Sequence, residues 1–189
     1  MINLAILASG SGTNAEALVK HFQNHARIRV VFILSNKKDA GVLDRADRLG
    51  VKKELFTKAE METDDFIKML KEKEVDLIIL AGFLLKIPSS LIAAFPNKII
   101  NIHPALLPKY GGKGMYGQRV HEAVLENNEE ESGITIHIVN EAYDEGRHLF
   151  QAKLKVKHEE SPDELASRIH KLEHQHFPEV VEKYALSLF

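Results

Sequence analysis

Two residues with complementary chemistry stand two positions apart near the middle of the chain. Asn101 and His103 directly follow the apolar pair Ile99-Ile100, at the start of the segment NIHPALLPKYGGKG. Alternate residues of a strand point to the same side, so an amide and an imidazole would project together from the end of a buried strand. The amide can donate to a developing oxyanion, and the imidazole can move a proton near neutral pH. The pair predicts proton-transfer chemistry, whereas a lone histidine there would predict only a local hydrogen bond.

The segment after this pair can continue neither as strand nor as helix. Pro104 biases His103 toward an extended backbone, and residues 108–117 hold four of the eleven glycines in the chain. We expect residues 108–120 to form a mobile flap over a pocket. Lys113 and Arg119 could assist anion binding there, although solvated surface charge is the simpler interpretation.

A glycine-rich turn near the start of the chain is a second candidate site. Residues 9–15 read SGSGTNA, which places G-x-G-x-x-A between an apolar strand and a helix. Free backbone N–H groups at such a helix start can bind a phosphate. The next strand ends at Ser35-Asn36 with no acidic residue to hold a ribose hydroxyl, which argues against a dinucleotide. A plain strand-to-helix turn stays possible.

A histidine cluster, HKLEHQH at residues 170–176, is a possible metal site. His170 and His174 are four residues apart and could share one helix face, as zinc ligands do. Glu173 is not in the second position of the HExxH pattern, however, and no third ligand is evident. A solvated helix face is the simplest interpretation, and we expect no metal.

The elements that must position these residues alternate along the first half of the chain. Apolar runs predict strands at 3–8, 28–34, 53–56, 76–81 and 98–102, and helical patterns predict helices at 14–26, 41–50, 63–74 and 88–95. Strands that are apolar throughout are typical of a parallel sheet covered on both faces. The ligand site of such a sheet lies at the carboxyl ends of its strands, where Asn101 and His103 would stand.

The pattern changes after residue 130. Residues 134–139 and 148–156 alternate between apolar and polar and flank a turn-like YDEG, which predicts an antiparallel pair. Ser161-Pro162-Asp163-Glu164 forms a helix start with a capping box. That helix should continue toward His176, and Pro178 should interrupt or restart it. We predict one α/β domain over residues 1–189, with a mostly parallel sheet, helices on both faces and an antiparallel C-terminal extension.

Composition narrows the function classes. The chain of 189 residues has a net charge of −2 and a sequence pI near 6.6, which gives no electrostatic case for nucleic acid or membrane surfaces. No apolar run is long enough to span a bilayer. Without cysteine there is no disulfide, thiolate ligand or cysteine nucleophile. The N-terminus lacks the charged start of a signal peptide, so we expect a cytoplasmic enzyme.

Three motifs taken together carry a family resemblance: ILASGSGTN, DLIILAGFL and NIHPALLPKYGGKG, in that order. In these the chain resembles, almost end to end, the folate-dependent phosphoribosylglycinamide formyltransferases of purine synthesis. The resemblance implies a Rossmann-like formyltransferase domain that is a monomer or homodimer. It implies transfer of the formyl group of 10-formyltetrahydrofolate, a cosubstrate, to the amino group of glycinamide ribonucleotide without a metal.

The resemblance also assigns roles by position. It implies that Asn101 holds the formyl oxygen, that His103 is the general acid, and that Asp144 assists the histidine by raising its pKa and ordering water. It further implies substrate contacts, with the phosphate bound by Gly12, Thr13 and Asn14 and the rest of the ribonucleotide contacted by Glu173 and His170. The implied folate site is lined by two segments besides Asn101: Leu84, Leu85, Lys86 and Ile87 on one side, and Asn140, Glu141, Ala142, Tyr143 and Asp144 on the other.

Some positions depart from the family pattern, and the sequence leaves other functions open. Many relatives have an arginine where this chain has Leu85-Lys86, and an arginine near the start of the 63–74 helix has no equivalent. Glu145-Gly146-Arg147 replaces a common Gly-Gly-Pro. One alternative is a methionyl-tRNA formyltransferase or a formyltetrahydrofolate hydrolase, although each of these would normally carry a further domain. Two others are a ligand-binding protein without activity and a nicotinamide dehydrogenase.

Overall fold

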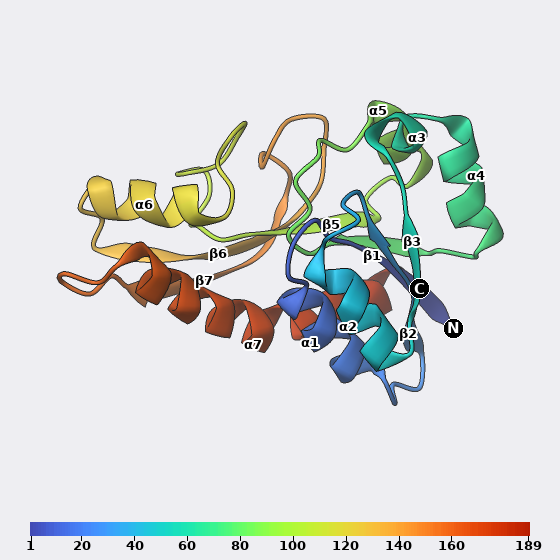
Figure 1. The fold of residues 1–189 in the computed structure, drawn as a ribbon, viewed down its shortest axis with the longest axis horizontal. Coiled ribbons are helices and arrows are strands. Elements are labelled where there is room, and N and C mark those ends of the chain that lie inside the picture. Colours follow the sequence, from blue (N-terminus) through green and yellow to red (C-terminus); the bar gives the residue numbers. More distant parts are fainter.

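The computed structural model describes residues 1–189 and folds them around one seven-stranded sheet (Figure 1). The strands lie in the order β3-β2-β1-β4-β5-β6-β7. Their bounds are β1 Ile2–Leu7, β2 Ile28–Ser35, β3 Lys52–Leu55, β4 Leu77–Leu80, β5 Ile99–His103, β6 Glu131–Ile138 and β7 His148–Lys155. The pairs from β3 to β5 are parallel, and the pairs β5–β6 and β6–β7 are antiparallel. The predicted parallel sheet with an antiparallel extension is confirmed.

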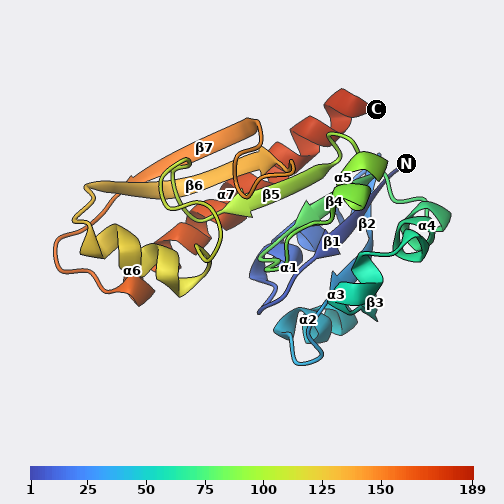
Figure 2. The same ribbon diagram turned by 90° about the horizontal axis from the view of Figure 1, so that it is seen from above.

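Seven helices cover the sheet: α1 Thr13–Phe22, α2 Gly41–Leu49, α3 Lys58–Met61, α4 Asp64–Glu72, α5 Ser89–Ala94, α6 Gln118–Glu126 and α7 Pro162–Leu188. Helices α1, α2 and α7 lie on one face of the sheet and α3, α4 and α5 on the other (Figures 1 and 2). None of the helices is both long and apolar enough to cross a membrane.

The apolar strands follow from this double cover. In β1, Leu4 and Ile6 enter the core under α1, α2 and α7, whereas Ala5 and Leu7 enter the second core under α3, α4 and α5. A strand buried on both faces is therefore apolar at most positions. The polar exception in β1 is Asn3, whose side chain donates to the carbonyl of Glu74 and accepts from Arg29.

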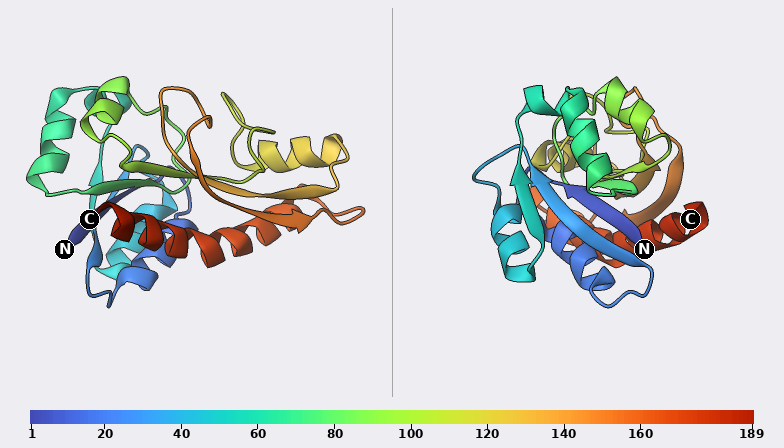
Figure 3. Two further views of the ribbon diagram at one scale, coloured as in Figure 1. Left: turned by 180° about the vertical axis from the view of Figure 1, so that it is seen from behind. Right: turned by 90° about the vertical axis from the view of Figure 1, so that its right-hand side faces the viewer.

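The long helix α7 corrects one prediction. It begins at the predicted Ser161 capping box and then runs without interruption through Pro178 to Leu188, so the predicted break is wrong. Proline removes one hydrogen bond within the helix. The flanking residues Phe177 and Val181 are fully buried, and this packing keeps the axis on the sheet. Figure 3 shows α7 as one continuous helix along its face of the sheet.

A second correction concerns the glycine-rich segment. Residues 111–117 form an irregular loop, but the rest of the predicted flap is helix α6, which starts at Gln118. Gly117 turns the chain into the helix with a positive φ of 57°, which favours glycine. Val120 and Val124 then bury one face of α6. The short helix α3, capped by Thr57, was not predicted.

Candidate active site

The carboxyl ends of β1, β4 and β5 meet at one edge of the sheet. The strand order reverses between β1 and β4, so the chain leaves these two strands toward opposite sides and opens a crevice. A pocket of about 470 Å³ occupies this crevice. Segments 82–87, 101–104 and 112–118 line it together with residues of 137–144 and α7. Its position matches the predicted site.

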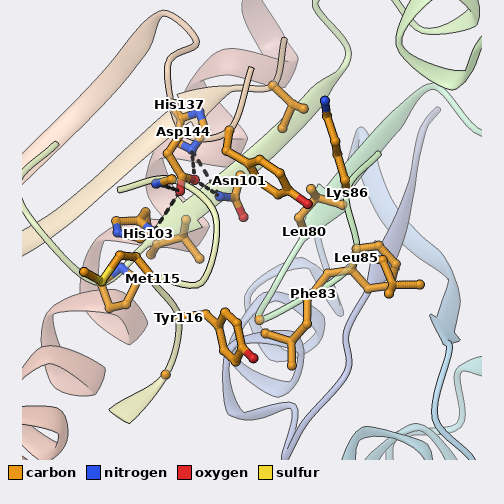
Figure 4. Close-up of a pocket in the computed structure, with 18 of the residues that line it drawn as sticks. Leu80, Phe83, Leu85, Lys86, Asn101, His103, Met115, Tyr116, His137 and Asp144 are labelled. Atoms are coloured by element: carbon orange, nitrogen blue, oxygen red, sulfur yellow. Dashed lines mark hydrogen bonds and ion pairs between the residues drawn. The ribbon is translucent and has the colours of Figure 1, made fainter. Parts of the chain in front are cut away.

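Asn101, His103 and Asp144 converge in this pocket (Figure 4). His103 Nδ1 lies 3.7 Å from Asp144 Oδ2. Asn101 Nδ2 donates to Asp144 Oδ1 at 3.4 Å, and Asp144 Oδ2 accepts the backbone N–H of Gly112 at 2.9 Å. Asp144 therefore connects the end of β5 to the glycine-rich loop, and the predicted set of three residues does come together.

His137 is a fourth member that the sequence did not reveal. It stands opposite Asn101 across the antiparallel β5–β6 pair, with Nε2 3.1 Å from Asn101 Nδ2 and 3.5 Å from Asp144 Oδ1. Its Nδ1 lies 3.1 Å from the carbonyl oxygen of Ile138, so the ring is held with Nε2 toward Asn101 and Asp144. The only signal in the sequence was one imidazole within the apolar run ITIHIV.

Burial decides the protonation of the central pair. It lowers the pKa of His103 below 6.5, although the charge of Asp144 and the hydrogen bond to Tyr110 act to raise it. Asp144 thus acts on the pKa of His103 in the expected direction, but burial outweighs it because His103 is only 4% exposed. Burial also acts to raise the pKa of Asp144, but His137, His103 and the Gly112 N–H outweigh it and hold that pKa below its usual value. The set therefore pairs a carboxylate with a histidine that is mostly neutral at pH 7.

A second polar group joins the glycine loop to α7. Asn14 Nδ2 donates to the buried carboxylate of Glu173 at 2.8 Å, and His170 Nδ1 lies 2.8 Å from the same oxygen. This contact raises the pKa of His170, whose protonated form donates to the carboxylate. Asn14, His170 and Glu173 all line the pocket, whereas Gly12 and Thr13 lie at the start of α1 outside its lining.

The start of α1 has the geometry of a phosphate loop. Gly12 is the N-cap with a φ of 78° and provides no side-chain cap, so the first N–H groups of α1 have no partner within the helix. Arg45, which the sequence did not single out, donates to the carbonyl of Ser11 and also contacts Glu16. The loop thus offers free donors beside a fixed guanidinium.

Replacing Gly12 tests this geometry. In Gly12→Ala the new Cβ would meet Val42 Cβ at 2.5 Å, and an L residue would be held at a positive φ. We expect a loss of about 2 kcal/mol or more in the free energy of unfolding, measured by urea denaturation. Gly10→Ala is the matched control because nothing lies within 4 Å of its added Cβ. Equal stability of the two variants would contradict the strained turn.

Two segments form the apolar side of the pocket. Leu84 is 38% exposed and is anchored by its backbone N–H to the hydroxyl of Ser9, whereas Ile87 belongs to the second core. Lys86 lies over the ring of Tyr143 from the opposite segment, at 5.5 Å from its centroid. Of the predicted folate contacts, those in the lining are Leu84, Leu85, Lys86, Ile87, Asn101, Asn140, Ala142, Tyr143 and Asp144. Glu141 is not, because its carboxylate contacts Ser89.

The histidine cluster does not form a metal-binding group. The His170 and His174 rings stack with centroids 6.3 Å apart, and His176 packs on Phe150. No three histidine, aspartate or glutamate side chains lie close enough to hold one ion.

His121 is a buried histidine beside the pocket whose Nδ1 has no hydrogen-bond partner. Burial and the neighbouring His170 lower its pKa to about 4, and Glu173 acts against this. Since the unfolded chain binds this proton more readily, stability is lost as pH falls from 6.5 toward 4. We expect His121 to contribute about 2 kcal/mol of the loss between pH 7 and pH 5.

Urea denaturation at pH 7 and pH 5 measures this loss. His121→Gln should lose correspondingly less stability on acidification than the unsubstituted protein. His158→Gln, at a side chain that is 93% exposed, is the control. An acid sensitivity that His121→Gln leaves unchanged would contradict the role of His121.

The fold and the site define a class: a Rossmann-like α/β protein with a histidine, a carboxylate and an amide at the carboxyl ends of a parallel sheet. A family model described as formyl transferase matches residues 2–181. The chain belongs to the formyl transferase family.

Individual relatives of this chain share a more specific name within the family. The chain is 43% identical to the chloroplastic phosphoribosylglycinamide formyltransferase of Arabidopsis thaliana, over 94% of this chain and 63% of that relative. It is 34% identical to the Haemophilus influenzae phosphoribosylglycinamide formyltransferase, over 96% of this chain and 86% of that one. The solved glycinamide ribonucleotide transformylase 1 of Symbiobacterium toebii superposes with a TM-score of 0.89 at 32% identity, covering 99% and 89% of the two chains. The chain spans only about 60% of the length of the plant relatives.

Proposed function

We propose that the protein is a phosphoribosylglycinamide formyltransferase that moves the formyl group of 10-formyltetrahydrofolate to the amino group of glycinamide ribonucleotide in purine synthesis. The observation that supports this best is the convergence of Asn101, His103 and Asp144 in one pocket of a formyl transferase fold. Relatives named for this activity in bacteria and plants agree with it.

The ribonucleotide would lie between the start of α1 and α7. Its phosphate would be held by the backbone N–H groups at Gly12, Thr13 and Asn14, because a helix N-terminus favours an anion. The buried carboxylate of Glu173 could accept hydroxyl or amine protons from the ribonucleotide, with His170 beside it. This arrangement would direct the glycinamide amine toward His103.

The folate would lie against the apolar wall. Leu84 to Ile87 offer apolar side chains and exposed backbone, and residues 140–144 face them across the pocket. A flat heterocycle with amide-like edges suits such a site. Lys86 over Tyr143 is the one cation on this wall and could contact an anionic part of the donor.

The reaction would proceed by addition and elimination. The amine nitrogen bonds to the formyl carbon, and the carbonyl electron pair moves to the formyl oxygen. An N–H of the Asn101 side chain would stabilise this oxyanion. That N–H would come from the 3.4 Å hydrogen bond to Asp144, which is longer and weaker than the one Asn101 shares with His137. The bond to N10 of the folate then breaks, and tetrahydrofolate leaves with the proton that the amine lost. His103 Nδ1, facing Asp144, is placed to transfer protons.

A spectrophotometric formyl-transfer assay with and without glycinamide ribonucleotide tests the proposal. We expect folate product only when the ribonucleotide is present. Product without the acceptor would indicate a hydrolase, and no product would indicate a binding protein or another acceptor. A cytoplasmic location and a monomeric or dimeric state stay predictions, and two plant relatives are named as chloroplastic.

A further inference from the structure

The imidazole of His103 is oriented by a backbone carbonyl. His103 Nε2 lies 2.7 Å from the carbonyl oxygen of Tyr110. A carbonyl can only accept, so Nε2 carries a proton in both the neutral and the charged ring. Nδ1, which faces Asp144, is then the nitrogen that gains and loses the second proton. The direction of the Tyr110 carbonyl therefore decides which nitrogen is available for chemistry.

That direction depends on an unusual backbone conformation. Tyr110 has a φ of 56°, in the left-handed region that few residues other than glycine adopt. It lies in the irregular segment between β5 and α6, where no strand or helix fixes the peptide plane. Contacts of the Tyr110 side chain therefore have to hold this peptide in its orientation.

The contacts of the Tyr110 side chain form a clamp. Its hydroxyl donates to Glu129 Oε1 at 2.9 Å, and its ring packs against the larger core. Lys109 Nζ donates to both oxygens of the same carboxylate, at 2.8 and 2.9 Å. Glu129 precedes β6, and its backbone N–H is bonded to the carbonyl of Val124 in α6. The carbonyl beside His103 is thereby connected to the turn between α6 and β6, away from the substrate pocket.

We propose that Tyr110 is a positioning residue, and that the clamp formed by Tyr110, Glu129 and Lys109 fixes His103 with its Nε2 proton on the Tyr110 carbonyl and its Nδ1 toward Asp144. None of the three clamp side chains forms a hydrogen bond or ion pair with Asn101, His103 or Asp144. The contribution of the clamp to turnover rests on the proposed function. Its control of the orientation and protonation of the His103 ring does not.

Tyr110→Phe is the main test because it removes only the hydroxyl and keeps the ring in the core. Nitrogen-15 NMR of the imidazole rings shows which nitrogen carries the proton, and the His103→Gln spectrum identifies the His103 signals. We expect the neutral ring of the unsubstituted protein to be protonated at Nε2, and Tyr110→Phe to show a mixture of both forms. We also expect kcat to fall about ten-fold with KM changed less than two-fold, short of the roughly 10²–10⁴-fold that full loss of proton transfer costs.

Two further variants separate positioning from general stability. Glu129→Gln keeps an oxygen for the tyrosine hydroxyl and should behave like the unsubstituted protein, whereas Glu129→Ala should match Tyr110→Phe. Lys153→Ala breaks the nearby exposed pair with Glu131 and should change neither measurement. Unchanged His103 signals, or an unchanged kcat, in both Tyr110→Phe and Glu129→Ala would overturn the proposal. If the unsubstituted protein transfers no formyl group, the proposed function fails, and the nitrogen signals alone decide the role of the clamp.

Discussion

His103→Ala is expected to reduce kcat by about 10²- to 10⁴-fold, the usual contribution of a positioned proton-transfer group. The ring is 4% exposed, faces Asp144 and has its other nitrogen bonded to the Tyr110 carbonyl, so it is held in a fixed orientation for proton transfer. The Kd for glycinamide ribonucleotide, measured by calorimetry, should change little because the proposed contacts at α1 and Glu173 are intact. Formyl-transfer kinetics at saturating substrates measure the turnover.

Two comparisons keep this result interpretable. His103→Gln retains a polar side chain of similar reach and should be nearly as slow, because an amide cannot be protonated near neutral pH. His158→Ala, at an exposed site, should retain full turnover. A loss of less than ten-fold in His103→Ala would show that His103 takes no part in the chemistry. The rate enhancement would then have to come from Asn101 and from holding the two substrates close together.

The sequence revealed those site residues whose position follows from the end of a strand. Asn101 and His103 could be predicted because they are the polar residues in the last three positions of an apolar strand, and parallel strands present their carboxyl ends at one edge. The glycine loop at residues 9–15 could be predicted for the same reason, because it follows the end of an apolar strand. These predictions needed only local pattern and one general property of parallel sheets.

His137 and Tyr110 depend on information that the sequence does not carry in local form. His137 reaches the site through the register that places it opposite Asn101, and a shift of one residue would turn it to the other face. Tyr110 acts through its carbonyl, so the type of its side chain gave no signal. Pro178 failed as a helix breaker because packing on both sides of it outweighs one missing hydrogen bond.

The role of Asp144 is tested by the pH dependence of the reaction. Its negative charge opposes the effect of burial on His103, so Asp144→Asn should lower the pKa of that histidine further. If protonated His103 donates to the oxyanion, kcat/KM falls as pH rises through this pKa. In Asp144→Asn this descending limb should therefore move to lower pH.

We expect the rate of Asp144→Asn at pH 7.5 to fall by about 10- to 100-fold, less than for loss of the imidazole itself. The profile should be measured from pH 5 to pH 9, with Asp47→Asn, at an exposed carboxylate paired with Lys53, as the control. A descending limb at an unchanged pH would show that Asp144 orders the site without tuning His103. A rate that rises through this pKa would mean that neutral His103 first accepts the amine proton at Nδ1, where Asp144 stabilises the resulting charge. Because the Tyr110 carbonyl fixes the Nε2 proton in either case, the sign of this single limb separates a general acid from a general base at the same nitrogen.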